Sequence, residues 1–259
     1  MKREEQLALK KVEYEGKVYP SNRFGDVKIL EYKNNKQVVI MFLNTGFIKE
    51  EAMGDIRSGY IRDSSLPTTC GFGYIDIEGA SIGRNMTKEY RLWNNMVNRC
   101  YNEKILSRNP TYKDCHVSED WRYLSNFKEW CNRQIGFEQE DWHLDKDILV
   151  KGNKVYSENT CCFIPKEVNL LFTKADRIRG KYPVGVYYDT SKTHKRFSAR
   201  VSKNGKHKRF GSYLTPEEAF AVYKREKEKY IKEVANKWKD QIDPRVYESL
   251  MNWTIEITD

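Results

Sequence analysis

The strongest constraint on the fold lies in residues 182–238, where three short strand-like stretches precede the start signal of a helix. The stretches are VGVYYD, KRFSARVS and KHKRFGSY, and Asn204-Gly205 between the last two is typical of a tight β-hairpin turn. The helix signal combines a capping Thr215, Pro216 at the first helical position and Glu218 at the third. This order predicts a three-stranded antiparallel sheet covered by one helix.

Alternation along the strands predicts two different faces for this sheet. Side chains of successive strand residues point to opposite faces, so every second residue shares a face. The face predicted to meet the helix holds Phe197, Ala199, Val201 and Phe210, and the helix meets it through Ala219, Tyr223, Tyr230 and Val234. The open face is predicted to hold Arg196, Ser198, Arg200, Ser202, His207 and Arg209.

The positive charge of the chain is concentrated in the same region. Residues 174–211 hold twelve basic and two acidic side chains, a net charge of +10, whereas the whole chain carries +9. A solvated surface is the alternative explanation, but the interleaved aromatic residues and the scarcity of acids favour a polyanionic partner. The charged residues are Lys174, Arg177, Arg179, Lys181, Lys192, Lys195, Arg196, Arg200, Lys203, Lys206, Lys208 and Arg209, with Asp176 and Asp189.

The combination of GVYYD, RFSARVS and FGSYLTPEEAFAVY resembles the AP2 (ERF-type) DNA-binding domain. The resemblance implies a partner of double-stranded DNA, with the open sheet face in the major groove. Its groove-facing positions correspond to Tyr187, Arg196, Arg200, His207 and Arg209. Arg200 stands where the plant-type pattern has an acid and Arg209 where it has a tryptophan, so base specificity does not transfer.

The central segment combines two helices with a strand, a loop and a returning strand. Apolar spacing predicts helices in residues 88–104 and 121–136, followed by the strand-loop-strand region in residues 143–169. The segment resembles phage-encoded HNH endonucleases, many of which carry a trailing AP2-like domain. The motifs are Trp93-x-x-Met96-x-x-Arg99-Cys100-Tyr101, Val117-x-x-x-Trp121 with Phe127, Leu144-Asp145-Lys146-Asp147, Gly152-Asn153 and Tyr156-Ser157-x-Asn159-x-Cys161.

This second resemblance implies a DNA endonuclease with one divalent metal, Mg²⁺ or Mn²⁺. Asp145 and Asn159 correspond to the metal ligands, and the helix with the last polar residue of the family falls on residues 165–169. Lys146 stands where many HNH enzymes have a histidine base, and a lysine with a pKa of about 10.4 is protonated at neutral pH. Lys146 either grips phosphate or leaves the role of base to His143, which shares a strand face with Asp145. An exposed charged strand is the non-catalytic alternative.

The first 82 residues predict a β-rich domain without a recognisable site. VKILEY and KQVVIMFL predict two half-buried strands joined by a turn at residues 33–35, and the glycine spacing suggests a small β-barrel. There is no apolar run of about 18 residues and no signal peptide, so we expect a cytoplasmic protein, in the host cytoplasm if it is phage-encoded. The six cysteines include no CxxC pair and predict reduced, buried thiols; Cys100, Cys115, His116 and Cys131 match no common zinc spacing.

The sequence therefore predicts a multidomain α+β protein. The predicted domains are a small β-rich domain in residues 1–82, a ββα-metal (HNH-like) domain in 83–173 and an AP2-like domain with a helical extension in 174–259. The predicted function is a site-recognising DNA endonuclease of the HNH type. The alternative is a DNA-binding or regulatory protein with a degenerate, inactive HNH fold.

Overall fold

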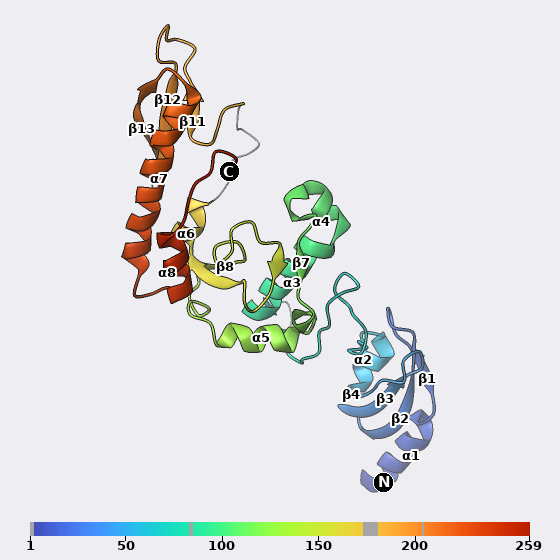
Figure 1. Ribbon diagram of the computed structural model, residues 1–259. Helices are drawn as coiled ribbons and strands as arrows, with labels where there is room; N and C mark the ends of the chain where they lie inside the picture. The colour runs from blue at the N-terminus through green and yellow to red at the C-terminus, as the bar shows by residue number, and fades with distance from the viewer. Residues whose placement is uncertain (1–2, 83–84, 173–180, 204) are drawn as a thin grey trace. The chain divides into compact units, whose positions relative to one another are not determined.

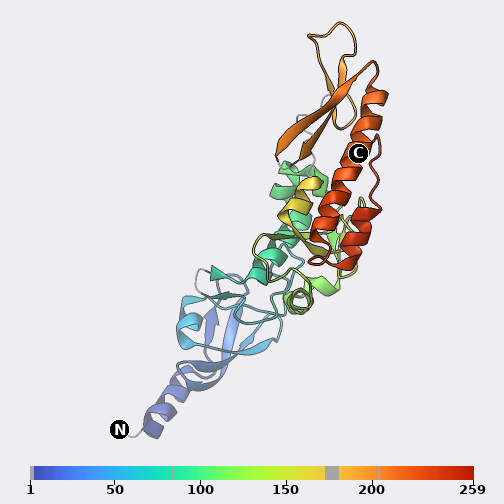
Figure 2. The same cartoon turned by 90° about the vertical axis from the view of Figure 1, so that its left-hand side faces the viewer.

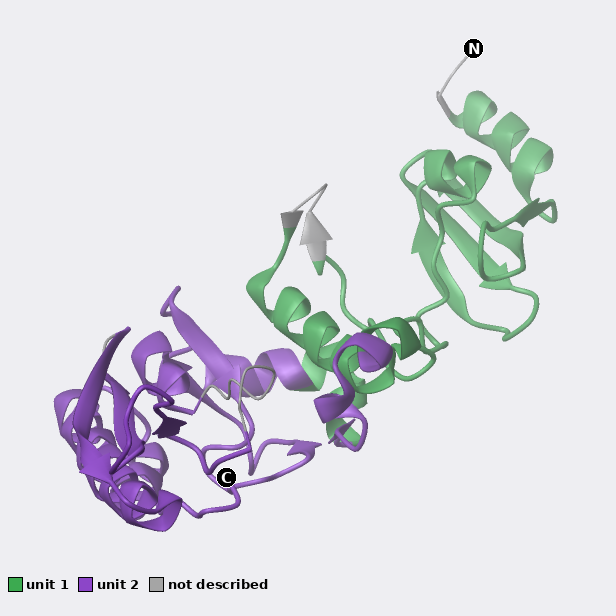
Figure 3. Ribbon diagram, turned by 90° about the horizontal axis from the view of Figure 1, so that it is seen from above, with its two compact units in different colours: residues 1–105, 119–126 green, residues 106–118, 127–259 purple. Residues whose placement is uncertain are grey.

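The computed structural model describes residues 3–82, 85–172, 181–203 and 205–259, which form an α+β protein with several small sheets. The chain divides into two compact units, one of residues 1–105 and 119–126, the other of residues 106–118 and 127–259 (Figure 3). The predicted division into three domains stays a prediction. None of the helices in the described part of the chain has the length and apolar composition that crossing a membrane requires.

An antiparallel four-stranded sheet forms most of the first unit. Its strands are β1 (Val18–Pro20), β2 (Asp26–Asn34), β3 (Gln37–Phe42) and β4 (Ile48–Glu51), in that order. The predicted hairpin is confirmed, with its turn at residues 35–36, slightly later than expected. The sheet is open, with β1 and β4 at its edges, so the predicted barrel is wrong for these strands.

Alternate residues of β2 and β3 build the core of this sheet. Ile29 and Ile40 pair across the strands and are fully buried. Two helices accompany the sheet, α1 (Arg3–Tyr14) and α2 (Met53–Ser58), and Tyr14, Met53 and Ile56 belong to the same core.

The predicted helices of the central segment are confirmed. The first is α3 (Lys88–Tyr101), capped by the Thr87 hydroxyl, and it buries Trp93 and Met96. The second is α5 (Leu124–Asn132), in which Leu124, Phe127, Trp130 and Cys131 are all buried. Smaller elements in this region are β5 (Ser81–Ile82), β6 (Asn85–Met86), α4 (Glu103–Arg108), β7 (His116–Val117), β9 (Val155–Tyr156) and two short 3₁₀ turns at Pro110–Tyr112 and Asp120–Arg122.

The second unit contains a two-stranded hairpin followed directly by a short helix. The strands β8 (Trp142–Asp145) and β10 (Cys162–Pro165) pair antiparallel, with His143 opposite Ile164 and Asp145 opposite Cys162. The helix α6 (Lys166–Leu171) starts where β10 ends. This gives a ββα order along the chain.

The predicted sheet and helix of residues 182–238 are also confirmed. The strands β11 (Val186–Tyr188), β12 (Phe197–Lys203) and β13 (Lys206–Tyr213) form an antiparallel sheet with β12 in the centre. The helix α7 (Pro216–Trp238) begins at Thr215, whose hydroxyl accepts a hydrogen bond from the Glu218 backbone N–H. Gly185 has a φ of +74°, and a Cβ there would lie 2.0 Å from the Tyr223 ring, so this position requires glycine.

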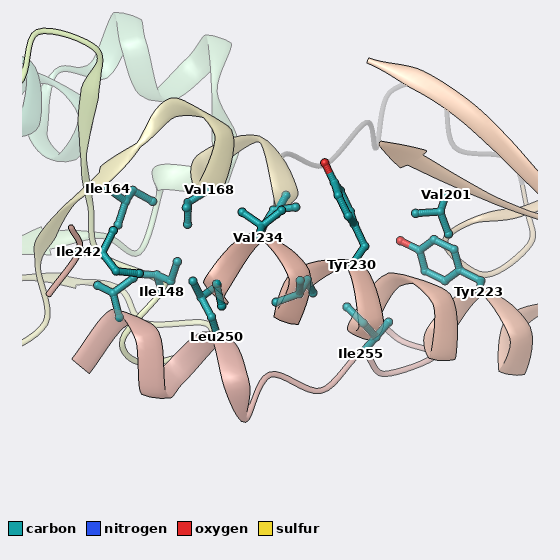
Figure 4. Packing of buried hydrophobic residues seen from close by; sticks show 14 of the residues in the cluster. Ile148, Ile164, Val168, Val201, Tyr223, Tyr230, Val234, Ile242, Leu250 and Ile255 are labelled. Atoms are coloured by element: carbon teal, nitrogen blue, oxygen red, sulfur yellow. The ribbon is translucent and has the colours of Figure 1, made fainter. Parts of the chain in front are cut away.

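The hairpin, the sheet and the C-terminal helices share one hydrophobic core (Figure 4). The sheet lies beside the N-terminal half of α7, while α6 and α8 (Pro244–Met251) lie beside its C-terminal half (Figure 1). Figure 2 shows α7 and α8 running side by side in the turned view. Buried members of this core include Ile148, Ile164, Val168, Val201, Tyr223, Tyr230, Val234, Val246 and Leu250.

Candidate functional site

The open face of the β11–β12–β13 sheet gathers the side chains predicted to lie there. Arg200 of β12 pairs directly opposite Arg209 of β13, and Ser202 pairs opposite His207. Directly opposed residues of an antiparallel pair share a face, so the two arginines lie side by side. The other face is buried against α7 through Ala199 and Val201.

Aromatic rings of β11 hold two of these arginines. The guanidinium carbon of Arg200 lies 4.5 Å from the centre of the Tyr187 ring, a cation–π distance. Arg196 donates from Nη1 to the Tyr188 hydroxyl at 2.7 Å. Tyr187 and Tyr188 are 43% and 37% exposed, so both rings are accessible from solvent.

Arg209 contacts a serine of its own strand, β13, and the carboxylate that follows β11. Its Nη2 donates to the Ser212 hydroxyl at 2.7 Å and lies 3.9 Å from a carboxylate oxygen of Asp189. The other oxygen of this carboxylate accepts hydrogen bonds from the backbone N–H and the hydroxyl of Ser191. Arg196 and Arg200 are thus oriented by tyrosines, whereas Arg209 is paired with the Asp189 carboxylate.

Ser198 departs from its predicted place on the open face, and some members of the basic cluster in residues 174–211 lie elsewhere or outside the described residues. Ser198, which pairs opposite Tyr187 of β11, is fully buried, although strand alternation placed it on the open face. Lys203 turns towards α7, where its ammonium contacts Glu233 and the Tyr230 ring. Lys174, Asp176, Arg177, Arg179 and Asn204 lie outside the described residues.

The ββα region brings His143 to a residue that the sequence did not single out as a site residue. Asn169 of α6 donates from Nδ2 to His143 Nδ1 at 3.0 Å. The imidazole is exposed, and the bond at Nδ1 leaves Nε2 for another partner. The signal for Asn169 was its place at the end of the helix expected in residues 165–169.

Asp145 lies two residues after His143 on β8, on the same side of the strand. Its Oδ1 accepts hydrogen bonds from the backbone N–H groups of Asp147 and Ile148, both at 2.8 Å. Burial raises the pKa of the Asp145 carboxyl, and these two backbone bonds offset part of the rise. The carboxylate therefore supports the turn after β8 with one oxygen.

Lys146 is buried and its ammonium group is occupied. Nζ donates to the Asp147 carboxylate at 2.7 Å and to the Asn153 carbonyl at 2.8 Å, and it lies 5.7 Å from the centre of the Tyr156 ring. Asn153 returns a bond from Nδ2 to the Lys146 carbonyl at 2.7 Å. In this arrangement Lys146 closes the loop that carries Gly152-Asn153.

The second predicted metal ligand, Asn159, lies in a different setting. It is exposed and lines a pocket of about 500 Å³ together with Val150, Glu248 and Asn252. Asp145 is not part of this lining in the described part of the chain. Asn169, which contacts His143, is a second amide side chain close to strand β8.

The donor chemistry near Asp145 fits a hard divalent cation only in part. A carboxylate and an amide oxygen are ligands that Mg²⁺ and Mn²⁺ accept. Among the residues that the structure describes, no group of three or more His, Cys, Asp or Glu side chains is arranged to hold a metal ion.

Five cysteines are buried, whereas Cys70 is exposed, which corrects the prediction that all six are buried.

Lys146 and Asn153 lie in the motifs that predicted a nuclease site, but their side chains are used to hold the loop. Both belong to strong sequence signals, yet each satisfies a backbone group of the same loop. The open sheet face is different because its side chains point away from the core.

Comparisons of the chain with protein-family models, with curated proteins and with solved structures found no match.

Proposed function

We propose that the protein binds double-stranded DNA through the open face of the β11–β12–β13 sheet. The observation that carries the proposal is the direct cross-strand pairing of Arg200 with Arg209. Like charges directly opposite each other destabilise a sheet, and an anion bound at this face would relieve their repulsion. Phosphate groups and guanine edges are the nucleic-acid groups that arginines recognise.

The neighbouring aromatic residues support the same proposal. Tyr187 lies against Arg200 and Tyr188 against Arg196, so the guanidinium groups are oriented before a ligand arrives. Orientation in the free protein lowers the entropy cost of binding. A face that combines oriented arginines with the half-exposed Tyr187 ring suits contact with the groove of a DNA duplex.

A salt titration with a matched charge control tests the proposal. The double variant Arg200→Gln/Arg209→Gln should bind a duplex more weakly, and the slope of log Kd against log salt should fall by about two. The control is Lys229→Gln/Lys232→Gln, which removes two exposed charges from α7. Equal losses in both double variants would mean that binding follows net charge and would overturn the assignment to the sheet.

A second candidate function, metal-dependent DNA cleavage, is favoured by the bond between Asn169 and His143 beside Asp145. Asp145 with the amide oxygen of Asn169 or Asn159 would hold Mg²⁺ or Mn²⁺, which supplies Lewis-acid stabilisation of a phosphodiester. His143 would accept the proton of the attacking water through Nε2. A protein that keeps this fold for binding or regulation alone is the alternative, and cleavage assays of variants at these positions separate the two.

A further inference from the structure

One side of α7, here called its stripe and marked by Tyr223, Tyr230 and Val234, packs against both the basic sheet and the β8–β10 hairpin region. Tyr223, Tyr230 and Val234 follow a spacing of seven and four residues and point to one side of the helix in Figure 4. All three belong to the hydrophobic core that includes residues of the hairpin and of the sheet. One helix therefore supports both parts.

The N-terminal end of this stripe holds the sheet. The Tyr223 ring lies against Gly185, where a Cβ would approach it to 2.0 Å. Gly185 lies two residues before Tyr187, and its carbonyl accepts a hydrogen bond from the Arg200 backbone N–H at 2.9 Å. The contact with α7 is thus next to the open-face residues.

The C-terminal end of α7 holds the hairpin and α6. Trp238 donates from Nε1 to Glu167 of α6 at 2.8 Å, and its ring packs edge-on against Trp142 of β8 with centroids 6.1 Å apart. Trp142 precedes His143, and Glu167 lies two residues before Asn169. Both elements that carry the His143–Asn169 pair are therefore anchored to Trp238.

The helix between these two anchors is continuous. Residues 217–238 contain neither glycine nor proline, which are the usual causes of helix kinks. Tyr223 and Trp238 are fifteen residues apart, which corresponds to about 22 Å along a helix.

We infer that α7 is a spacer that holds the His143–Asn169 pair at a fixed offset from the DNA contact of the sheet. The inference rests on the proposed binding of duplex DNA by the sheet, and it does not require cleavage by the protein. The proposed partner is a single DNA duplex that contacts both the open sheet face and the ends of β8 and α6.

Directed cleavage by a tethered iron–EDTA chelate tests the offset. The full chain carries Cys70→Ser, because Cys70 is exposed and the other five cysteines are buried. A chelate is attached through Ser202→Cys on the open sheet face or through His143→Cys, which also removes the candidate base. With end-labelled duplexes selected for binding, the centres of the two cleavage patterns should be separated by the same number of base pairs on every duplex.

The outcomes distinguish this inference from the proposed function. A chelate at Lys229→Cys, an exposed position off the stripe of α7, serves as the control and should give at most weak, scattered cuts. If the Ser202→Cys chelate cuts at one place while the His143→Cys chelate gives no cuts or a variable offset, the spacer role is wrong and DNA binding stands. If neither chelate cuts and binding shows no salt dependence, the proposed function fails and the spacer role with it.

Discussion

The ammonium nitrogen of Lys227 lies 6.0 Å from the centre of the Tyr230 ring, on the stripe of α7 that faces the core. Lys227 is only 8% exposed, and burial lowers its pKa to about 8. A lysine in this position is costly when protonated, because the charge has been removed from water. The consequence is a pH dependence of stability that one substitution can reveal.

Lys227→Met should make the protein more stable at pH 7, by about 1 to 3 kcal/mol. In the wild type the unfolded chain holds a proton on this lysine between pH 8 and the ordinary lysine pKa of 10.5, whereas the folded chain does not. Stability should therefore rise with pH across this window, and the cost should be fully present below it. Urea unfolding of both proteins at pH 7, 8.5 and 10 measures the difference, which should shrink as pH rises; a constant difference would contradict it.

Arg209→Gln should weaken duplex binding by about 1 to 3 kcal/mol if the side chain contacts a base edge. The free energy of unfolding should stay within about 0.5 kcal/mol of the wild type, because the lost Ser212 contact is offset by relief of the Arg200 repulsion. Fluorescence anisotropy and urea unfolding measure the two quantities. Parallel losses of stability and affinity would show that Arg209 acts through the fold.

With Mg²⁺ or Mn²⁺ present, the chain should nick duplex DNA, and chelation should stop nicking without stopping binding. Asp145→Ala should abolish the nicking while salt-dependent binding remains, because the sheet arginines lie on other strands. His143→Ala should slow it by about 10² to 10⁴ if the imidazole is the general base. Nicking at the wild-type rate in both variants would assign the activity to other residues or to a contaminant.

Thr215→Ala should destabilise the protein by about 1 kcal/mol. The threonine hydroxyl satisfies the backbone N–H of Glu218 at 3.2 Å, which alanine leaves without a partner at the start of α7. Thr215→Ser keeps the hydroxyl and is the matched control. Thermal unfolding of the three proteins provides the measurement, and an equal melting temperature for alanine and serine would mean that the cap contributes nothing.

Gly185→Ala should cost more stability than Gly205→Ala. Both glycines have a φ of +74°, so alanine is strained at either position. A Cβ at Gly185 meets the Tyr223 ring, whereas a Cβ at Gly205 meets nothing within 4 Å. The difference in unfolding free energy between the two variants isolates the clash from the backbone strain, and equal losses would show that the ring moves aside freely.

Local signals in the sequence determined most of the elements of this protein. The apolar spacing of α3 and α5, the hairpin of β2 and β3, the three strands of the basic sheet and the Thr215 cap depend on neighbours within a few residues. Strand alternation also placed Arg200 and Arg209 on the open face, because period-two geometry is local. Their exact opposition needed the register, which a bulge near Ser198 shifts.

Only the tertiary structure decided which polar residues are available for chemistry. Lys146 lies in the motif that predicted a nuclease site, yet it closes its own loop through Asn153. Asn169, 26 residues after His143, supplies the contact to the imidazole. The shared core under α7 likewise joins segments that the sequence presents as separate domains. These outcomes depend on contacts between residues far apart in the chain, whose partners no local pattern of spacing or charge specifies.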